Sequence, residues 1–353
     1  MSRFLKDCYQ ALEAYTPGEQ PRDMAYIKLN TNESPFPPAP AVVEKLQKAD
    51  IENLRLYSDP TCKALKEKLA GLYGLQPENI FVSNGSDDIL NFLFMAFPGA
   101  KGAVFPDISY GFYSVYAQLH GVNARKIPLK ADFSLDYTDY LNADALVVIA
   151  NPNAPTGMTI PVCQIEEVLK QNPDNVVVID EAYVDFGAES CYPLLKTYDN
   201  LVVVRTFSKS RCLAGGRLGY AMGPAALIAD LEKLKYSTNP YSINRLTLTL
   251  GEATVDAEDY YVNMCATIAE NRQWTAQKLE SLGFHVLPSK ANFLFAKAPN
   301  MDGGQLYLQL KQRGILVRHF TGQRIKDYIR ITIGTAQQME TFIETVKTLL
   351  QEA

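Results

Sequence analysis

The sequence predicts an α/β fold with two domains, and three observations support this prediction. Short apolar runs alternate with segments of helical periodicity between about residues 80 and 229. The apolar runs are continuous in Val, Ile and Leu, which is typical of strands that helices cover on both faces. The last third of the chain has a different order of elements. We therefore expect a large domain, with a mixed, mostly parallel seven-stranded sheet under helices, and a smaller α+β domain.

Each element of the large domain follows from a local pattern. The apolar runs have the length of buried strands, and the segments between them have the 3.6-residue period of amphipathic helices. The expected strands are Ile80–Ser83, Gly102–Phe105, Arg125–Pro128, Ala145–Ala150, Val176–Asp180, Leu201–Thr206 and Leu218–Met222. The expected helices are Ser86–Phe97, Phe112–His120 and Pro161–Gln171.

The smaller domain begins with a long polar helix and continues with short strands. In Tyr328–Ile333 isoleucines alternate with polar residues, which predicts a half-buried strand with Arg330 on its polar face. The expected helices are Ala257–Ser281 and Ala336–Gln351, and the expected strands are Asn292–Lys297, Ile315–Arg318 and Tyr328–Ile333. We expect three units: an irregular N-terminal segment (1–30), the large domain (31–250) and the small domain (251–353).

Composition narrows the class of protein. The net charge of −5 gives no electrostatic footprint for nucleic acid. The N-terminal residues lack the pattern of a signal peptide, and the apolar runs are too short to cross a bilayer. Six scattered cysteines without a CxxC pair indicate free thiols in a reducing cytoplasm, and three isolated histidines make a metal site unexpected. We therefore expect a cytoplasmic protein without nucleic-acid or membrane partners.

Lys209 follows the apolar run Leu201–Thr206 and lies between two hydroxyl residues, with Arg217 eight positions further on. Hydroxyls and a guanidinium suit a phosphate, which accepts several hydrogen bonds at once. A lysine amine suits a Schiff base with an aldehyde. Pyridoxal 5'-phosphate (PLP) carries both an aldehyde and a phosphate, so this segment predicts a PLP site.

Three further polar motifs follow expected strands. They are Asn84-Gly85-Ser86-Asp87, Asn151-Pro152-Asn153-Ala154-Pro155-Thr156-Gly157 and Asp180-Glu181-Ala182-Tyr183. Taken singly, such motifs are more often helix caps, turns or solvated charges. Ligands of open α/β sheets bind beyond the carboxyl ends of the strands, so four motifs at strand ends in one chain favour a shared binding site.

PLP chemistry gives each motif an expected role. Lys209 holds the cofactor and then acts as general acid and base, with a pKa lowered by burial near Arg217. An ionised Asp180 pairs with the pyridine nitrogen, and Tyr183 donates a hydrogen bond to the ring oxygen O3'. The phosphate is expected to bind Thr206, Ser208, Arg217 and the amides of Gly85 and Ser86, beside Asp87. Tyr110 is expected to stack on the ring, although without the other motifs a core aromatic would be the favoured interpretation of this tyrosine.

These residues together resemble the fold-type I PLP-dependent aminotransferases of class I/II, and more narrowly the histidinol-phosphate aminotransferases. The resemblance extends over nearly the full length of the chain. Besides the motifs above it includes Leu29-Asn30-Thr31-Asn32-Glu33-Ser34-Pro35, Tyr57-Ser58-Asp59-Pro60, Leu213-Ala214-Gly215-Gly216-Arg217, Pro240-Tyr241-Ser242-Ile243-Asn244, Ala291-Asn292-Phe293 and Tyr328-Ile329-Arg330-Ile331-Thr332-Ile333-Gly334.

The resemblance implies a reaction and further site residues. It implies amino transfer between L-histidinol phosphate and 2-oxoglutarate, giving imidazole-acetol phosphate and L-glutamate in histidine biosynthesis. It implies a homodimer in which Tyr57 reaches the partner's cofactor phosphate and Tyr241 lines the partner's pocket. It also implies that Arg330 binds the anionic end of the substrate, that Arg318 assists at the phosphate, and that Asn292 orients Arg330.

The sequence departs from the family pattern in two places. Ala154 replaces an asparagine that donates to O3', so either Asn153 takes over this contact or Tyr183 makes it alone. Gly18-Glu19 follow Thr16-Pro17 where the family often has a phosphate-contacting tyrosine, which leaves Tyr15 and Tyr26 as candidates.

An aromatic amino acid aminotransferase and an L-threonine-O-3-phosphate decarboxylase on the same scaffold are the alternative functions. A ligand sensor in a transcription regulator is disfavoured, because about thirty residues before the first motif are too few for a helix-turn-helix segment.

Overall fold

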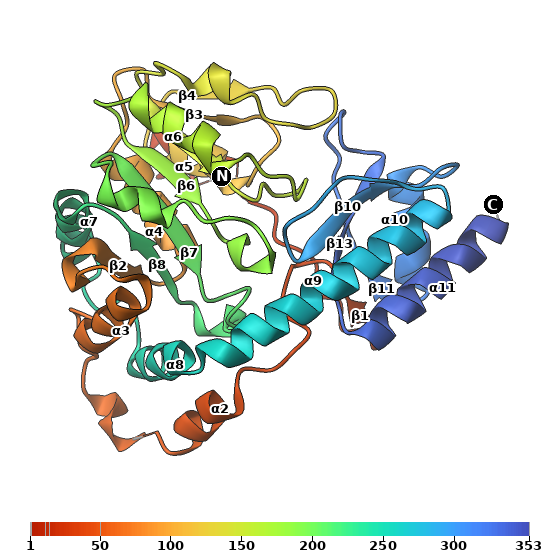
Figure 1. The fold of residues 1–353 in the computed structure, drawn as a ribbon, viewed down its shortest axis with the longest axis horizontal. Helices are drawn as coiled ribbons and strands as arrows, with labels where there is room; N and C mark the ends of the chain where they lie inside the picture. The colour runs from red at the N-terminus through yellow and green to blue at the C-terminus, as the bar shows by residue number, and fades with distance from the viewer. Residues whose placement is uncertain (1, 11, 14, 50, 353) are drawn as a thin grey trace.

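The computed structural model describes residues 2–10, 12–13, 15–49 and 51–352. It has a larger part built on a seven-stranded sheet and a smaller part built on a four-stranded sheet. Helix α9 (Glu258–Ser281) runs from the first part to the second (Figure 1). The two parts correspond to the α/β and α+β architecture that the sequence predicts.

The large sheet is mixed and mostly parallel, as predicted. Its order is β2-β8-β7-β6-β5-β3-β4, and only β8 runs antiparallel to its neighbours. In that order the strands are β2 (Ile80–Ser83), β8 (Gly219–Met222), β7 (Leu201–Thr206), β6 (Val177–Asp180), β5 (Leu146–Ala150), β3 (Ala103–Pro106) and β4 (Ala124–Ile127). Their bounds differ from the predicted ones by one residue at most.

Helices cover both faces of this sheet, which explains why its strands are continuously apolar. Successive residues of a strand point to opposite faces, so Val177 and Ile179 enter one apolar core and Val178 enters the other. One face is covered by α3 (Lys63–Tyr73), α6 (Val162–Lys170) and α8 (Arg245–Asp256). The opposite face is covered by α4 (Ser86–Ala96), α5 (Phe112–Leu119) and α7 (Ala225–Thr238).

The smaller part contains an antiparallel sheet with the order β12-β13-β10-β9. Its elements are β9 (His285–Val286), β10 (Phe293–Lys297), β12 (Arg318–His319), β13 (Tyr328–Thr332), α10 (Gly303–Gln312) and α11 (Ala336–Glu352). The predicted single strand Ile315–Arg318 is wrong. It is divided into β11 (Ile315–Leu316), which pairs with β1, and β12, which pairs with β13. A change of hydrogen-bonding partner at Val317 divides it, and hydrophobic pattern alone does not reveal such a change.

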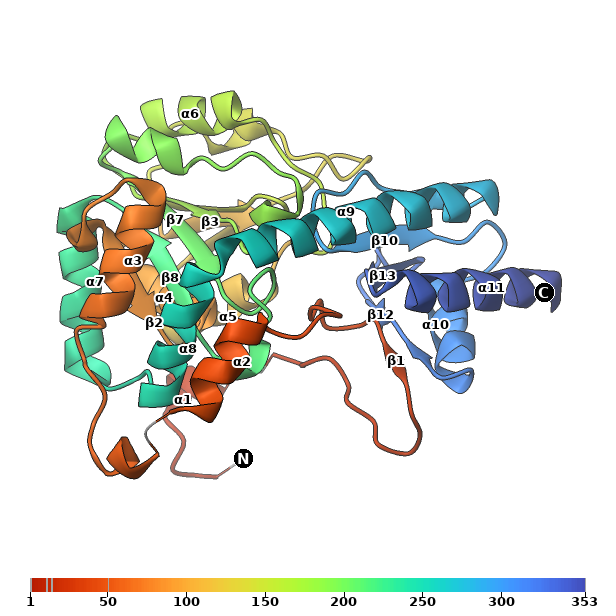
Figure 2. The same ribbon diagram turned by 60° about the horizontal axis from the view of Figure 1, so that its bottom comes forward.

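The end of the N-terminal segment, with strand β1, packs on the smaller part (Figure 2). Strand β1 (Ile27–Lys28) is parallel to β11, and the backbone N–H of Thr332 in β13 donates to the carbonyl of Leu29 at 2.9 Å. Leu29, Ala39 and Val42 are buried in the same apolar core as β10 and β13, together with Phe186 and Ala253. Residues from before position 43 and from the larger part therefore complete the core of the smaller part. The other helices of this region are α1 (Asp7–Gln10) and α2 (Pro40–Gln47).

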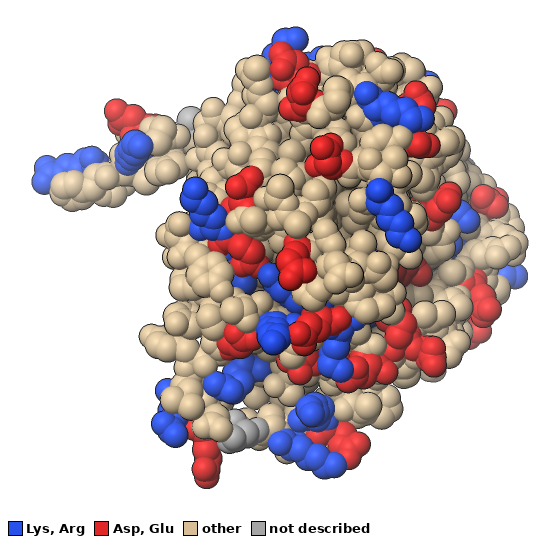
Figure 3. Space-filling view, turned by 60° about the vertical axis from the view of Figure 1, so that its left-hand side comes forward, with Lys and Arg blue, Asp and Glu red and all other residues tan. Residues whose placement is uncertain are grey.

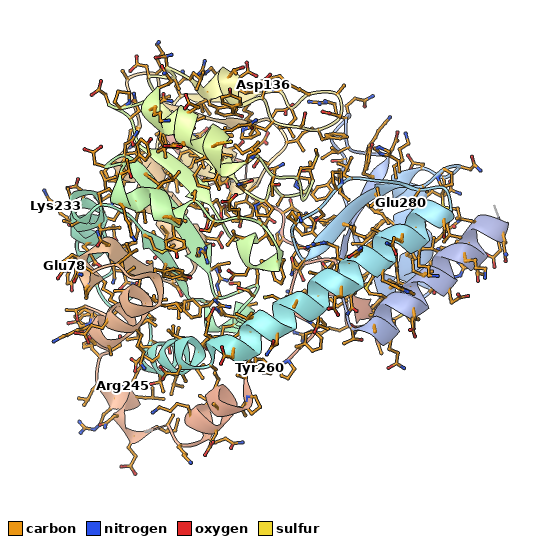
Figure 4. The ribbon with its side chains drawn as sticks, viewed as in Figure 1. Glu78, Asp136, Lys233, Arg245, Tyr260 and Glu280 are labelled. Atoms are coloured by element: carbon orange, nitrogen blue, oxygen red, sulfur yellow. The ribbon has the colours of Figure 1, made fainter. Side chains whose placement is uncertain are left out.

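Helix α9 is tied to both parts of the molecule. Figure 4 labels Tyr260 near its beginning and Glu280 near its end, beside the smaller part. Arg272 in its middle donates through Nη1 to the carbonyls of Phe186 at 2.8 Å and Ala291 at 2.7 Å. The helix spans about 36 Å at 1.5 Å per residue, so a single element fixes how the two parts face each other.

The surface has mixed charge. On the face shown in Figure 3, acidic and basic side chains are interspersed. Among the described residues, no helix combines the length and the apolar character that a membrane span needs. Short 3-10 helices complete the structure at Glu52–Arg55, Pro77–Asn79, Tyr137–Tyr140, Val184–Phe186, Tyr192–Lys196 and Ala214–Gly216.

Candidate active site

A cavity of about 390 Å³ lies at the carboxyl ends of β5, β6 and β7, next to the first turn of α4. Parallel strands bring their carboxyl ends to one edge of a sheet, which is why motifs far apart in sequence meet here. The predicted residues that line it are Ser86, Asp87, Tyr110, Asp180, Tyr183, Thr206, Ser208, Lys209 and Arg217. The cavity volume is within the usual range for small-molecule sites.

Lys209 faces this cavity from the turn after β7. Its Nζ donates to the carbonyl of Thr31 at 3.1 Å and lies 5.9 Å from the ring centre of Tyr183. Burial lowers the pKa of Lys209 to about 8, and the positive charges of Arg330 and Arg217 act in the same direction. The amine is therefore much easier to deprotonate than an ordinary lysine.

The turn that carries Lys209 is anchored by buried ion pairs. The Ser210 hydroxyl donates to Asp185 at 2.5 Å, and Asp185 also accepts from Arg205 at 3.1 Å. Arg205 in turn pairs with Glu181 at 2.9 Å. Sequence reasoning missed this network. Arg205 inside an apolar strand and Glu181 at the end of another are buried charges of opposite sign, which is the clue that predicts such a pair.

Asp180 ends β6, and its side chain is only 5% exposed. Its two oxygens accept hydrogen bonds from the Tyr113 hydroxyl at 2.7 Å and from the backbone N–H of Ala182 at 3.1 Å. Burial raises its pKa to about 6, although both hydrogen bonds oppose this rise, so the carboxylate is ionised at neutral pH. Sequence reasoning missed Tyr113, one of 20 tyrosines in the chain.

The opposite end of the cavity gathers groups that suit an anion. Arg217 and Tyr110 both bind Asp87, with Nη2 at 3.1 Å from one oxygen and the phenol at 2.6 Å from the other. Both oxygens of Asp87 are therefore engaged in positioning these two side chains, and direct binding of the cofactor by Asp87 stays a prediction. Gly85 has φ +88°, and a Cβ there would lie 2.8 Å from Nη2 of Arg217, so only glycine leaves this approach open.

This set of donors and acceptors fits PLP. An amine of lowered pKa suits an aldehyde, a buried carboxylate suits a protonated ring nitrogen, and tyrosine rings provide apolar walls. At the other end, Arg217, Ser86, Thr206 and Ser208 offer charge and hydroxyls for a phosphate. The backbone N–H of Ser208 already donates to Thr206 Oγ1 at 3.1 Å, which fixes that hydroxyl beside the lysine turn.

Asn153 is not among the residues that line this cavity, and its role as a cofactor-binding residue stays a prediction. Its amide nitrogen donates to the Ile108 carbonyl and the Thr156 hydroxyl, both at 3.0 Å, and its oxygen accepts from Ser109 at 2.8 Å. These bonds hold the loop after β5 and leave the side chain no spare donor. Ala154 lines the cavity instead.

A second cavity of about 360 Å³ adjoins the first and shares Thr31, Tyr110, Ala154, Tyr183 and Lys209 with it. Tyr15, Arg318 and Arg330 line its far side. The ring of Tyr15 stacks on Phe112 at 4.2 Å between centroids. Tyr26 is directed elsewhere and donates to Asp23. Of the two tyrosines that the sequence offers, Tyr15 is the one beside the arginines.

Arg330 and Asn292 both hold the N-terminal segment rather than each other. Nη2 of Arg330 donates to the carbonyl of Asn30 at 3.0 Å, and the amide of Asn292 donates to the carbonyl of Asn32 at 2.9 Å. No hydrogen bond joins Asn292 to Arg330 in the described part of the chain, and the orientation of Arg330 by Asn292 stays a prediction. Arg318 donates to the carbonyls of Thr16 and Pro17.

Arg330 also has an unpaired hydrogen-bond donor. Its Nε is buried and makes no hydrogen bond among the described residues. A buried unpaired donor is costly, so Arg330 is a candidate for binding an acceptor that a ligand supplies.

Tyr57 and Tyr241 lie outside both cavities. They are 77% and 43% exposed, and their rings stack on each other at 4.4 Å between centroids. The structure therefore does not bring them to the site of their own chain.

The fold and the site define a PLP-dependent enzyme of fold type I, and comparison with known proteins gives its family. The family model "Aminotransferase class I and II" matches residues 25–346. The histidinol-phosphate aminotransferases of Brachyspira hyodysenteriae and of a Marinomonas species are each 50% identical over 353 residues, covering 99% of this chain and 100% of each relative.

A solved structure agrees. Histidinol-phosphate aminotransferase from Sinorhizobium meliloti, in complex with PLP, superposes with a TM-score of 0.83 at 25% identity, covering 92% of each chain. The chain belongs to the histidinol-phosphate aminotransferase branch of the class I and II aminotransferase family, and its cofactor is PLP.

Proposed function

We propose that this chain transfers the amino group between L-histidinol phosphate and 2-oxoglutarate, giving imidazole-acetol phosphate and L-glutamate. The observation that carries the proposal is that the guanidiniums of Arg318 and Arg330 both line the second cavity, which Lys209 also lines. The Nε of Arg330 has no hydrogen-bond partner among the described residues. Histidinol phosphate has no α-carboxylate, so the same arginines must accept a phosphate in one half-reaction and a carboxylate in the other. Arg330 and Arg318 suit both anions, because a guanidinium binds oxyanions bidentately.

Two side chains of the first cavity, Lys209 and Asp180, carry the proposed chemistry. When bound, PLP supplies an electron sink for negative charge that develops on a substrate carbon. The Asp180 carboxylate, held by Tyr113, keeps the ring nitrogen protonated. Lys209 holds the cofactor at rest and, once displaced by substrate, moves a proton, for which a pKa near the working pH is favourable.

The phosphate of PLP is held, in this proposal, by Arg217, Ser86, Thr206 and Ser208. Tyr110 covers one side of the cavity with its ring, which its bond to Asp87 keeps in place. Tyr15 is proposed to contact the substrate phosphate, because it lines the second cavity beside Arg318 and Arg330.

A second copy of the chain is proposed to complete each site. The stacked Tyr57 and Tyr241 are exposed, and further exposed apolar side chains lie near Tyr57 in sequence: Val43, Leu46, Ile51, Leu54 and Leu56. A homodimer would cover these side chains and carry Tyr57 to the partner's cofactor phosphate.

The predicted domain boundaries at residues 30 and 250 stay part of this proposal. The cytoplasm is the proposed location, because all six cysteines lie in the described chain as free thiols.

Single half-reactions test the substrate. PLP-loaded protein is mixed with histidinol phosphate, glutamate, phenylalanine or threonine phosphate, and loss of the cofactor's visible absorbance is followed. We expect histidinol phosphate and glutamate to react faster than phenylalanine by about 100-fold, because phenylalanine has neither a phosphate nor a side-chain carboxylate to pair with Arg318 and Arg330.

Arg330→Lys is the matched control and should slow both preferred substrates, since lysine keeps the charge but loses the fork of donors. Equal rates with phenylalanine would favour an aromatic aminotransferase. Release of carbon dioxide from threonine phosphate without a 2-oxo acid would favour the decarboxylase.

A further inference from the structure

Asn32 is buried between the two parts of the molecule, and all four of its polar groups are hydrogen-bonded. Its backbone N–H donates to Thr332 Oγ1 at 3.0 Å, and its backbone carbonyl accepts from Asn292 at 2.9 Å. Its side-chain oxygen accepts from the Thr332 hydroxyl at 3.0 Å, and its side-chain nitrogen donates to the Tyr183 hydroxyl at 3.0 Å. Asn32 has φ +58°, a conformation that asparagine tolerates better than most residues.

These bonds determine where each proton lies. The Thr332 hydroxyl accepts the backbone N–H of Asn32, so its own proton goes to the Asn32 side-chain oxygen. This fixes the orientation of the amide, and its NH₂ group must face Tyr183. The Tyr183 oxygen is therefore an acceptor toward Asn32, and its own proton is directed away from Asn32.

Tyr183 lines both cavities, so that proton is available to a ligand. Burial raises the pKa of Tyr183, which keeps the proton on the phenol at neutral pH. The neighbouring position 154 is alanine, packed with Ala291, Phe293 and Tyr183, and it has no donor to offer.

We propose that Asn32 is a positioning residue, which turns the Tyr183 hydroxyl toward the ring oxygen of PLP and thereby takes over for the donor missing at Ala154. The proposal rests on the proposed function only for the contact between Tyr183 and the ring oxygen. A continuous series of hydrogen bonds runs from the smaller part to the first cavity through Thr332, Asn32 and Tyr183.

Asn32→Asp tests the proposal with a side chain of the same shape. Aspartate still accepts from Thr332, but it also accepts the Tyr183 proton and so turns that proton away from the cavity. The negative charge on the ring oxygen of PLP is then less stabilised. The nitrogen that joins PLP to Lys209, which lies next to this oxygen, therefore holds its proton more tightly. The measurement is the pH midpoint of the visible absorbance change of PLP-loaded protein, which should rise by about one pH unit, the effect of one hydrogen bond to a charged oxygen.

Tyr183→Phe completes a double-mutant cycle. We expect it to raise the midpoint as Asn32→Asp does, and we expect the double variant to rise no further, because both changes remove the same contact. Additive shifts, or no shift in Asn32→Asp, would overturn the proposal. A wild-type protein that shows no PLP absorbance would overturn the proposed function as well.

Two further variants separate positioning from general loosening. Asn292→Ala removes a different hydrogen bond to Asn32 and should leave the midpoint in place, so an equal rise there overturns the proposal. Thr332→Val frees the amide to rotate and should raise the midpoint, while Thr332→Ser should not. This pair applies if Asn32→Asp does not fold, and a midpoint unchanged in Thr332→Val also contradicts the proposal.

Discussion

Lys209 differs from an ordinary lysine because its ammonium form is surrounded by protein and by other cations. Removal from water disfavours the charge, and the guanidiniums of Arg330 and Arg217 disfavour it further. The same guanidiniums are proposed to bind the anions of substrate and cofactor. Binding these anions therefore changes the basicity of the amine that has to move the proton.

Lys209 should react with free PLP in a pH-dependent way. Only the neutral amine adds to the aldehyde, so the rate at which PLP binds covalently to the cofactor-free protein should rise with pH and level off above about 8. Stopped-flow absorbance measures this rate. An inflection near the ordinary value of 10.5 would contradict the lowered pKa.

Lys209→Ala should reduce turnover by about 10³-fold or more, the contribution of a positioned acid and base. Lys209→Arg is the matched control, because it keeps the positive charge and cannot release a proton. Borohydride reduction of the PLP-loaded wild type, followed by peptide mass spectrometry, should find the label at Lys209.

Some site residues could be predicted from the sequence and others could not. Lys209, Asp180 and Ser86 each lie within three residues of the end of an expected strand, so their place at the sheet edge follows from local pattern. Tyr113 and Asn32 act through partners 67 and 151 positions away, and nothing near them in sequence indicates those partners. Asn153 looked suitable by type, but its side chain is fully used in its own loop.

At the level of elements, helix α5 supports strand β6 at the point where chemistry is proposed. Tyr113, in the first turn of α5, is fully buried and donates to Asp180 at the end of β6. The helix therefore covers the sheet and also supplies a hydrogen bond that favours the charged form of the carboxyl.

Tyr113→Phe should raise the pKa of Asp180, because the carboxylate loses a donor. In the wild type, PLP affinity should fall as pH falls through about 6, where Asp180 becomes protonated and can no longer pair with a protonated ring nitrogen. In the variant this fall should begin about one pH unit higher.

Equilibrium binding of PLP to the cofactor-free protein over a pH series measures the effect. Tyr116→Phe, on the same helix with its ring stacked on Phe112, is the control and should leave the profile unchanged. Identical profiles for Tyr113→Phe and the wild type would show that the hydrogen bond does not affect Asp180.

The strands of the large sheet were predictable because both faces are covered, which leaves an uninterrupted apolar run in the sequence. The region 315–319 was not, because β11 and β12 are two residues each and belong to different sheets. The place of β1 was also beyond sequence reasoning, since its partner lies near the other end of the chain.

At the scale of the whole molecule, one chain gathers most of the proposed site but leaves Tyr57 and Tyr241 outside it. Both tyrosines are exposed, and they stack on each other. The proposed homodimer accounts for their exposure and for the apolar side chains of α2 and the segment that follows it.

Mixed dimers test shared sites. Tyr57→Ala and Lys209→Ala chains should each be nearly inactive alone, for lack of a phosphate contact and of the amine. After mixing and reassociation, one site of each hybrid has Lys209 from one chain and Tyr57 from the other. Activity should recover to about a quarter of the wild-type value, because half of the dimers are hybrids with one intact site.

Mixing each variant with itself is the control. Recovery of activity in the hybrid mixture alone would support shared sites. If verified hybrids recover no activity, Tyr57 does not act at the partner's site.

The apolar core of the smaller part includes Leu29 and Val42 from the beginning of the chain and Phe186 and Ala253 from the other part. A fragment that begins at residue 251 would expose to water the surface that Leu29, Val42 and Phe186 cover, at about 25 cal/mol for each Å². The C-terminal third is consequently not a transferable module. A chimera that exchanges it for the corresponding region of a relative must exchange residues 27–42 as well, or else be redesigned along the seam at Phe186.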